Sequence, residues 1–199
     1  MTPSNLTALL SRTIPAGLPT ITDGPPGSGK TAIHQQAAAA SGRDLVTIYP
    51  ALHDPTDLGG MPIPTTTDGK PTLVRYVDDL LSTIFDAKKP MLVLLDELGQ
   101  APPAMQAACA PLLLARKIGR YVVPDCVTFA ACTNRREDRA GASNILTHLT
   151  SRFATRLRLE PDPIDWLARA ALDGIAWEVQ SHIKTSPSQL MDFDGATHY

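Results

Sequence analysis

Short apolar runs alternate with longer segments of helical spacing along the 199-residue chain. Helices are predicted over 31–41 and 78–87, from about Pro102 to Lys117, and in a segment that ends near Thr150. Strands that alternate with helices predict an α/β fold, in which helices cover both faces of a parallel sheet and ligands bind at the carboxyl ends of the strands. The predicted strands are LPTIT, DLVTIY, MLVLLDE, CVTFAACTN and ATRLRLE.

The alternation is interrupted between His53 and Asp78, where proline, glycine and threonine are frequent. Asp68-Gly69 lies there between two extended segments and is typical of a hairpin tip, so a hairpin is predicted over 58–77. A floppy surface loop is the alternative, because prolines also punctuate disordered connections. Beyond Pro161 the pattern is helical only.

The stretch ITDGPPGSGKTAI joins the first strand to the first helix and contains the spacing G-x-x-x-x-G-K-T. Glycines in such a loop let backbone N–H groups turn toward an anion, and the start of a helix adds its positive dipole end. Lys30 is expected to reach the β and γ phosphates of a nucleotide, and the Thr31 hydroxyl to complete the shell of Mg²⁺. A chance Gly-Pro turn is the alternative. The predicted nucleotide-binding residues are Gly24, Pro25, Pro26, Gly27, Ser28, Gly29, Lys30 and Thr31.

An acidic pair, Asp96-Glu97, closes the apolar run MLVLLDE. At the end of a strand, Asp96 is suited to hold Mg²⁺ through water, and Glu97 is suited to polarise an attacking water. Phosphoryl hydrolysis needs these two tasks once the reactants are in position. An acidic helix start directly after a strand is the alternative interpretation.

Two more polar residues lie where predicted elements end. Asn134 closes VTFAACTN, where a neutral amide can orient the water or contact the γ phosphate, and a helix cap is the alternative. Arg152 lies after a helix and before a strand, a place suited to reaching a neighbouring subunit's phosphate, and a solvated surface arginine is the alternative. The predicted catalytic residues are therefore Glu97, Asn134 and Arg152.

Composition adds little to this picture. The chain is 43% hydrophobic and 19% charged with a formal net charge of −2, so no global field indicates nucleic acid or a membrane. Cys109, Cys126 and Cys132 lack C-x-x-C spacing and paired histidines, which argues against zinc and disulfide frameworks. The amino end has no signal-peptide pattern and no run approaches about 18 apolar residues, so a cytoplasmic protein is expected, neither secreted nor membrane-spanning.

Charge is nevertheless distributed unevenly along the chain. Residues 113–158 hold nine Lys/Arg against three Asp/Glu, whereas residues 159–199 hold two against seven. A basic side and an acidic side suit the head-to-tail contacts of a closed ring. A basic side would also suit a pore lined by DNA.

The order GPPGSGKT, MLVLLDE, AACTN, SRF resembles the AAA+ ATPases, and the segments DPTDLGGMPIP, RKIGRYVVPD and PIDWLARAALDGIAWEV are similar to the MoxR-type branch of bacteria and phages. The resemblance extends over residues 17–195. It implies a P-loop NTPase fold of three αβα layers around a parallel sheet of about five strands. It also implies an ATPase core over 1–160 with hairpin inserts at 58–77 and 117–125, followed by a short or truncated helical lid over 161–199.

Roles follow from the same resemblance, although two departures from the family pattern stand out. Relatives carry a sensor 2 arginine after a stretch like SPSQLMDFDG, whereas this chain reads GATHY. TNRRED places Arg135 and Arg136 where relatives often have proline or a small residue. The resemblance assigns Lys30 and Thr31 to Walker A, and Asp96 and Glu97 to Walker B. It assigns Asn134 to sensor 1 and Arg152 to the arginine finger.

The resemblance implies ATP and Mg²⁺ as cofactors of an ATP-hydrolysing ring, usually a hexamer of identical chains. Such a ring would remodel a macromolecular partner as a MoxR-like chaperone, often with a protein that contains a von Willebrand factor A domain. A nucleic-acid motor or loader that acts on DNA is the alternative, favoured by the basic segment but lacking a helix-turn-helix or aromatic stacking motif. A small-molecule kinase is a third reading, disfavoured because the sequence shows no acceptor site and because Glu97 and Asn134 fit water activation better.

Overall fold

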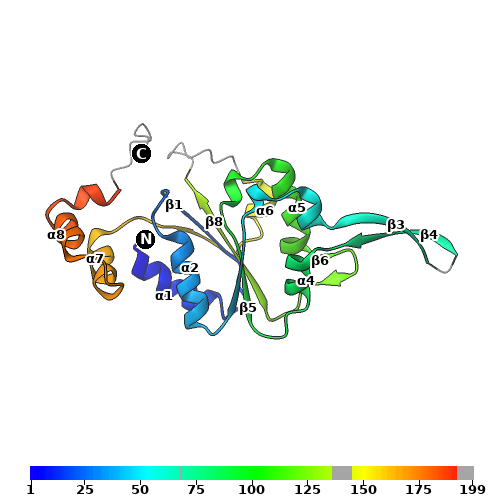
Figure 1. Ribbon diagram of the computed structural model, residues 1–199, viewed down its shortest axis with the longest axis horizontal. Coiled ribbons are helices and arrows are strands. Elements are labelled where there is room, and N and C mark those ends of the chain that lie inside the picture. The colour runs from blue at the N-terminus through cyan, green and yellow to red at the C-terminus, as the bar shows by residue number, and fades with distance from the viewer. Residues whose placement is uncertain (68, 136–144, 192–199) are drawn as a thin grey trace.

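The computed structural model describes residues 1–67, 69–135 and 145–191. Its centre is a five-stranded sheet in the order β2-β5-β8-β1-β9, and every neighbouring pair is parallel (Figure 1). This architecture confirms the predicted α/β class and the sheet of about five parallel strands. The strands are β1 (Thr20–Gly24), β2 (Asp44–Ile48), β5 (Met91–Leu95), β8 (Val127–Asn134) and β9 (Thr155–Arg158).

The two faces of the sheet bury two separate hydrophobic layers. Along β5, Met91, Val93 and Leu95 belong to one layer, whereas Leu92 and Leu94 belong to the other. Side chains alternate between faces at every residue of a strand, so both faces of β5 must be covered. This double burial explains why MLVLL reads as a continuous apolar run rather than an alternating one.

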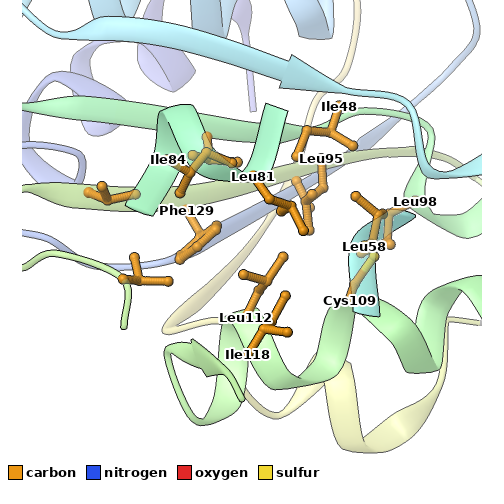
Figure 2. Packing of buried hydrophobic residues seen from close by; sticks show 14 of the residues in the cluster. Ile48, Leu58, Leu81, Ile84, Leu95, Leu98, Cys109, Leu112, Ile118 and Phe129 are labelled. Carbon is orange, nitrogen blue, oxygen red and sulfur yellow. The ribbon is translucent and has the colours of Figure 1, made fainter. Parts of the chain in front are cut away.

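Helices supply the covering layers. On one face, α4 (Asp79–Phe85) and α5 (Pro103–Leu114) pack around Phe129 of β8 (Figure 2). Phe129 is 1% exposed, and truncation of such a ring typically costs about 3–5 kcal/mol of unfolding free energy. On the other face, α1 (Pro3–Thr13) and α2 (Lys30–Ala40) complete the sandwich.

Helix α1 has no counterpart among the predicted elements. Thr2 caps it, because the Thr2 side chain accepts a hydrogen bond from the Asn5 N–H, and Pro3 occupies its first turn. Leu6 and Leu10, four residues apart, are fully buried. A threonine cap followed by proline and leucines at helical spacing was therefore the signal in the sequence.

Helix α5 ends at Leu114, so the prediction that it continues to Lys117 is wrong. Arg116 has a φ of 49°, a left-handed conformation that no helix continues through. Its guanidinium holds that turn, because Nη2 donates to the carbonyls of Pro124 at 2.7 Å and Val127 at 3.0 Å. The chain then forms a short hairpin of β6 (Lys117–Ile118) and β7 (Tyr121–Val122) within the predicted insert.

A second hairpin projects away from the sheet (Figure 1). After the 3₁₀ turn η1 (Pro50–Leu52) and the short helix α3 (Pro55–Gly59), strands β3 (Met61–Thr67) and β4 (Lys70–Tyr76) pair antiparallel. We call β3 and β4 the ribbon. The predicted pairing of two extended segments is confirmed here, while Asp68 lies outside the described residues.

In the part of the chain after β9 that the structure describes, up to residue 191, the regular structure is helical, as the sequence predicts. It forms α7 (Pro163–Leu172), α8 (Trp177–Thr185) and the 3₁₀ helix η4 (Pro187–Met191), at the end of the molecule opposite the ribbon (Figure 1). The segment that precedes β9 contains α6 (Thr147–Thr150). Within the described ranges, no helix combines the length and the apolar character that crossing a membrane requires.

Candidate functional site

The loop between β1 and α2 has the backbone of an anion-binding loop. Gly27 and Gly29 have φ angles of 71° and 84°, which side-chain-bearing residues rarely adopt. A Cβ at either position would meet no atom within 4 Å, so conformation rather than crowding requires glycine there. At Gly24 the reason is crowding, since a Cβ would lie 3.1 Å from Leu159 and 3.2 Å from the Ser28 hydroxyl.

Lys30, the first residue of α2, folds back over this loop. Its ammonium donates hydrogen bonds to the carbonyls of Gly24 at 3.0 Å and Pro25 at 2.7 Å, and to Oδ1 of Asn134 at 2.9 Å. Lys30 is only 8% exposed. The loop lysine and the strand-end asparagine, 104 positions apart in the chain, therefore meet, as expected for the carboxyl ends of the neighbouring strands β1 and β8.

Thr31 and Asp96 form the second contact of the site. The Thr31 hydroxyl donates to Oδ2 of Asp96 at 2.7 Å, and Oδ1 of Asp96 accepts the N–H of Glu97 at 3.0 Å. Asp96 is 5% exposed. A hydroxyl and a carboxylate this close form a set of hard oxygen donors of the kind that Mg²⁺ prefers, so the residues present fit a magnesium ion.

Glu97 differs from Asp96 in both exposure and backbone. Its side chain is exposed, and its φ of 56° and ψ of 31° place it in the left-handed region. A non-glycine residue held in that region costs about 1–3 kcal/mol, and such outliers concentrate at functional sites. This left-handed conformation at Glu97 turns the chain, just after β5, into the 3₁₀ helix η2 (Leu98–Gln100).

Helix η2 packs tightly on the end of β8. A Cβ at Gly99 would collide with the hydroxyl of Thr133, the residue before Asn134, and would lie 3.5 Å from Ile145. The segment after Glu97 is thus in close contact with the strand that carries Asn134. No pattern in the sequence predicts this contact, because it joins a 3₁₀ helix to a distant strand at a residue that has no side chain.

A buried histidine on α2 lies against β1. His34 is fully buried, its Nδ1 lies 2.9 Å from the Lys30 carbonyl, and its Nε2 lies 3.5 Å from the Thr22 hydroxyl on β1. Burial lowers the pKa of the His34 ring, which keeps it neutral near pH 7. The sequence-based prediction missed His34, although its position one turn after Lys30 was visible.

A cavity of about 390 Å³ lies beside the phosphate loop. Pro25 and Pro26 come from the loop, Arg135 directly follows β8, and the remaining residues come from the chain after β9. Arg135 was singled out in the sequence as extra charge, whereas the apolar residues were not predicted. The other lining residues are Pro161, Pro163, Pro187, Ser188, Leu190 and Met191.

Arg152 lies apart from this cluster. It follows α6, its N–H donates to the Leu149 carbonyl at 3.0 Å, and its side chain is exposed. Among the described residues, no hydrogen bond or ion pair joins Arg152 to Thr31, Asp96 or Glu97. Of the predicted site residues, the structure thus brings together the loop, the acid pair and Asn134, and leaves Arg152 facing solvent.

Comparisons with known proteins bear on the fold. A family model described as the viral superfamily 1 RNA helicase core domain matches residues 20–118, a range that includes the phosphate loop and the acid pair. Similar solved structures include a candidate ATPase from Cytophaga hutchinsonii, with a TM-score of 0.56 and 20% identity over 89% of this chain and 52% of that one. The fold is that of a P-loop NTPase.

Two more solved structures share the P-loop NTPase fold. The Holliday junction branch migration motor RuvB of Thermotoga maritima has a TM-score of 0.55 and 17% identity, over 87% of this chain and 51% of RuvB. NtrX of Brucella abortus in complex with ATP has a TM-score of 0.55 and 16% identity, over 87% and 41%. The chain thus spans about half the length of these proteins or less. No curated protein sequence matches it.

Proposed function

We propose that this P-loop NTPase binds ATP with Mg²⁺ and hydrolyses it to ADP and phosphate. The observation that carries the proposal is the contact of the Thr31 hydroxyl with Asp96 at 2.7 Å, beside the contact of Lys30 with Asn134 at 2.9 Å. Cation, hydroxyl, carboxylate and amide converge where the N-terminus of α2 meets the ends of β5 and β8. This is the set of groups that phosphate and magnesium recognition needs.

Each residue has a task in this proposal. Lys30 would exchange its carbonyl partners for phosphate oxygens, and Thr31 with Asp96 would hold the metal, which supplies charge neutralisation when bound. Glu97 would accept the proton of the attacking water, because its carboxylate is exposed directly beside Asp96. Asn134 would orient that water or the terminal phosphate.

The most direct test is the change Lys30→Ala. Nucleotide binding should be lost, because Lys30 is the only cationic side chain in residues 24–31. Titration calorimetry with ATP and Mg²⁺ measures this, and Lys88→Ala, at an exposed lysine before β5, is the matched control that should bind normally. Unchanged affinity in Lys30→Ala would remove the assignment of the loop.

We further propose that the chain works as an AAA+ ring, hexameric and MoxR-like, which remodels a macromolecular partner in the cytoplasm. The exposed position of Arg152 supports this, since an arginine that faces solvent is available to a neighbouring subunit. The segregation of basic and acidic residues along the chain suits head-to-tail contacts. A protein with a von Willebrand factor A domain is the proposed partner class.

The ribbon is the proposed partner-contacting element. Both of its strands are exposed at almost every described residue, including Met61, Leu73 and Tyr76, which are 54%, 65% and 63% exposed. Its base is fixed, because Nη1 of Arg75 donates to the carbonyls of Gly59 and Gly60. A rigid base with an exposed tip suits contact with another molecule rather than support of the fold.

Shortening the ribbon tests this role. Joining Ile63 to Val74, which are paired across the ribbon, through Asn-Gly would remove residues 64–73 and retain the Arg75 anchor. Basal ATPase activity should be unchanged and the melting temperature should stay within about 3 °C, while partner remodelling is lost. Calorimetry measures the melting temperature, and phosphate release measures the ATPase activity. Leu58→Ala, at a fully buried leucine of α3, is the destabilised control. A large fall in melting temperature would show that the ribbon supports the core.

A nucleic-acid motor is the second candidate function. The helicase description of the matching family model and the likeness to RuvB favour it. Turnover should then rise when single-stranded or duplex DNA, or RNA, is added, whereas a protein remodeller should not respond. Phosphate release in the absence of any acceptor would exclude the kinase reading.

A further inference from the structure

One polar side chain in the apolar interior connects two functional segments. Gln106, on α5, is completely buried, and its neighbours on the same helix, Met105 and Cys109, belong to the hydrophobic layer. Burying a primary amide is unfavourable unless its donor and its acceptor are both paired. The bonds that Gln106 makes therefore explain why an amide is present in this layer.

The two ends of the Gln106 amide bond to different parts of the chain. Nε2 donates to the carbonyl of Ala101 at 3.1 Å, and Oε1 accepts the N–H of Leu146 at 2.9 Å. Ala101 is the C-cap of η2, the helix that begins directly after Glu97. Leu146 is the N-cap of α6, and Arg152 follows the end of that helix by two residues.

The two segments also lie close together. A Cβ added to Gly99 would lie 3.5 Å from Ile145, the residue before Leu146. The amide thus joins two neighbouring segments, the one after Glu97 and the one before Arg152. A hydrogen bond is directional, so a shift of either segment must move the Gln106 side chain or break a bond.

We propose that Gln106 is a positioning residue that couples the hydrolytic site of one subunit to the arginine that the same subunit presents to its neighbour. The inference rests on the proposed ATPase ring. A leucine or methionine would fill the same volume without fixing a direction, so the coupling is a property of the amide. Loss of that amide should leave nucleotide binding intact and misplace Arg152.

The near-isosteric change Gln106→Met tests this in mixed rings. Alone, it should keep its affinity for ATP with Mg²⁺ within about twofold and lose at least about 10-fold in turnover. Mixed with Glu97→Gln, which supplies an intact arginine, Gln106→Met should regain activity. Mixed with Arg152→Ala, which depends on the arginine of the Gln106→Met subunit, it should remain inactive. Cys109→Ala, one turn along the same buried face, should behave alike in both mixtures.

Equal recovery in the two mixtures, or wild-type turnover with only a lower melting temperature, would show that Gln106 is structural and overturn the inference. If Gln106→Met does not fold, Gln106→Leu replaces it, because leucine also lacks both the donor to Ala101 and the acceptor for Leu146. Equal recovery in the two mixtures of Gln106→Leu would overturn the inference as well. Failure of the proposed function is distinguishable, because the wild type would then not bind ATP or Lys30→Ala would change nothing.

Discussion

Glu97→Gln is expected to lower ATP turnover about 100-fold or more while ATP affinity stays unchanged. The amide has the shape of the carboxylate and no basic oxygen, so it can occupy the same place without accepting a proton. The Asp96 carboxylate, its contact with Thr31 and the backbone turn at residue 97 are retained. Binding and chemistry should therefore separate in this variant.

Steady-state phosphate release and titration calorimetry measure the two quantities. Glu178→Gln, at an exposed glutamate on α8, is the matched control and should hydrolyse ATP at the wild-type rate. Light scattering with ATP should also show that Glu97→Gln remains assembled, because unhydrolysed nucleotide would persist between subunits. Normal hydrolysis by Glu97→Gln would assign the base to another residue.

The parts of the site that the sequence predicts are those that depend on local geometry. The glycines at 27 and 29 and the start of α2 at Lys30 follow from one short stretch of chain. The common edge at which Lys30 and Asn134 lie was also predictable, since parallel strands that alternate with helices place their carboxyl ends at one edge of the sheet.

The remaining parts depend on tertiary packing. The position of β8 between β5 and β1 is set by contacts far apart in the chain, and no local pattern specifies it. The close fit of Gly99 on Thr133 and the positive φ of Glu97 likewise have no signal in the local sequence. Gln106 left a trace in the sequence, because it is the only strongly polar residue in the helix PAMQAACAPLLL, but nothing local identifies Ala101 or Leu146 as a partner.

Arg152 shows a different limit. The sequence predicts its place after a helix and before a strand, and the structure has it exposed at that place. Whether it acts on a neighbour is a property of an assembly, which a single chain does not contain. A biochemical test of complementation between subunits is therefore needed.

Arg152→Ala should bind ATP and hydrolyse it about 10³ to 10⁵ times more slowly than wild type, the range for an arginine supplied to a neighbouring phosphoryl group. Arg169→Ala is the matched control. That arginine is also surface-exposed, and its Nε donates at 2.8 Å to Asp173, the C-cap of α7, so its loss should leave turnover unchanged. Wild-type turnover in Arg152→Ala would show that Arg152 is a solvated surface arginine with no part in hydrolysis.

Complementation then decides which subunit Arg152 serves. A competent site forms wherever an Arg152→Ala subunit presents its intact Lys30 and Glu97 to the intact arginine of a Glu97→Gln neighbour. With random equimolar mixing and independent sites, about one interface in four is of this kind, so activity should return to about a quarter of wild type. Coupling between neighbouring sites would lower that fraction.

The mixture could stay inactive even though native mass measurements show that its rings contain both variants. Such a result has two explanations, and mixing each variant with wild-type subunits distinguishes them. If one blocked site stalls the whole ring, adding either variant to wild-type subunits should inhibit the activity more steeply than the wild-type fraction falls. If Arg152 serves its own subunit, the activity should follow the wild-type fraction in proportion, because each wild-type subunit would carry a complete site. Recovery to about a quarter is the result expected only if two subunits share one site, with Lys30 and Glu97 on one and Arg152 on the other.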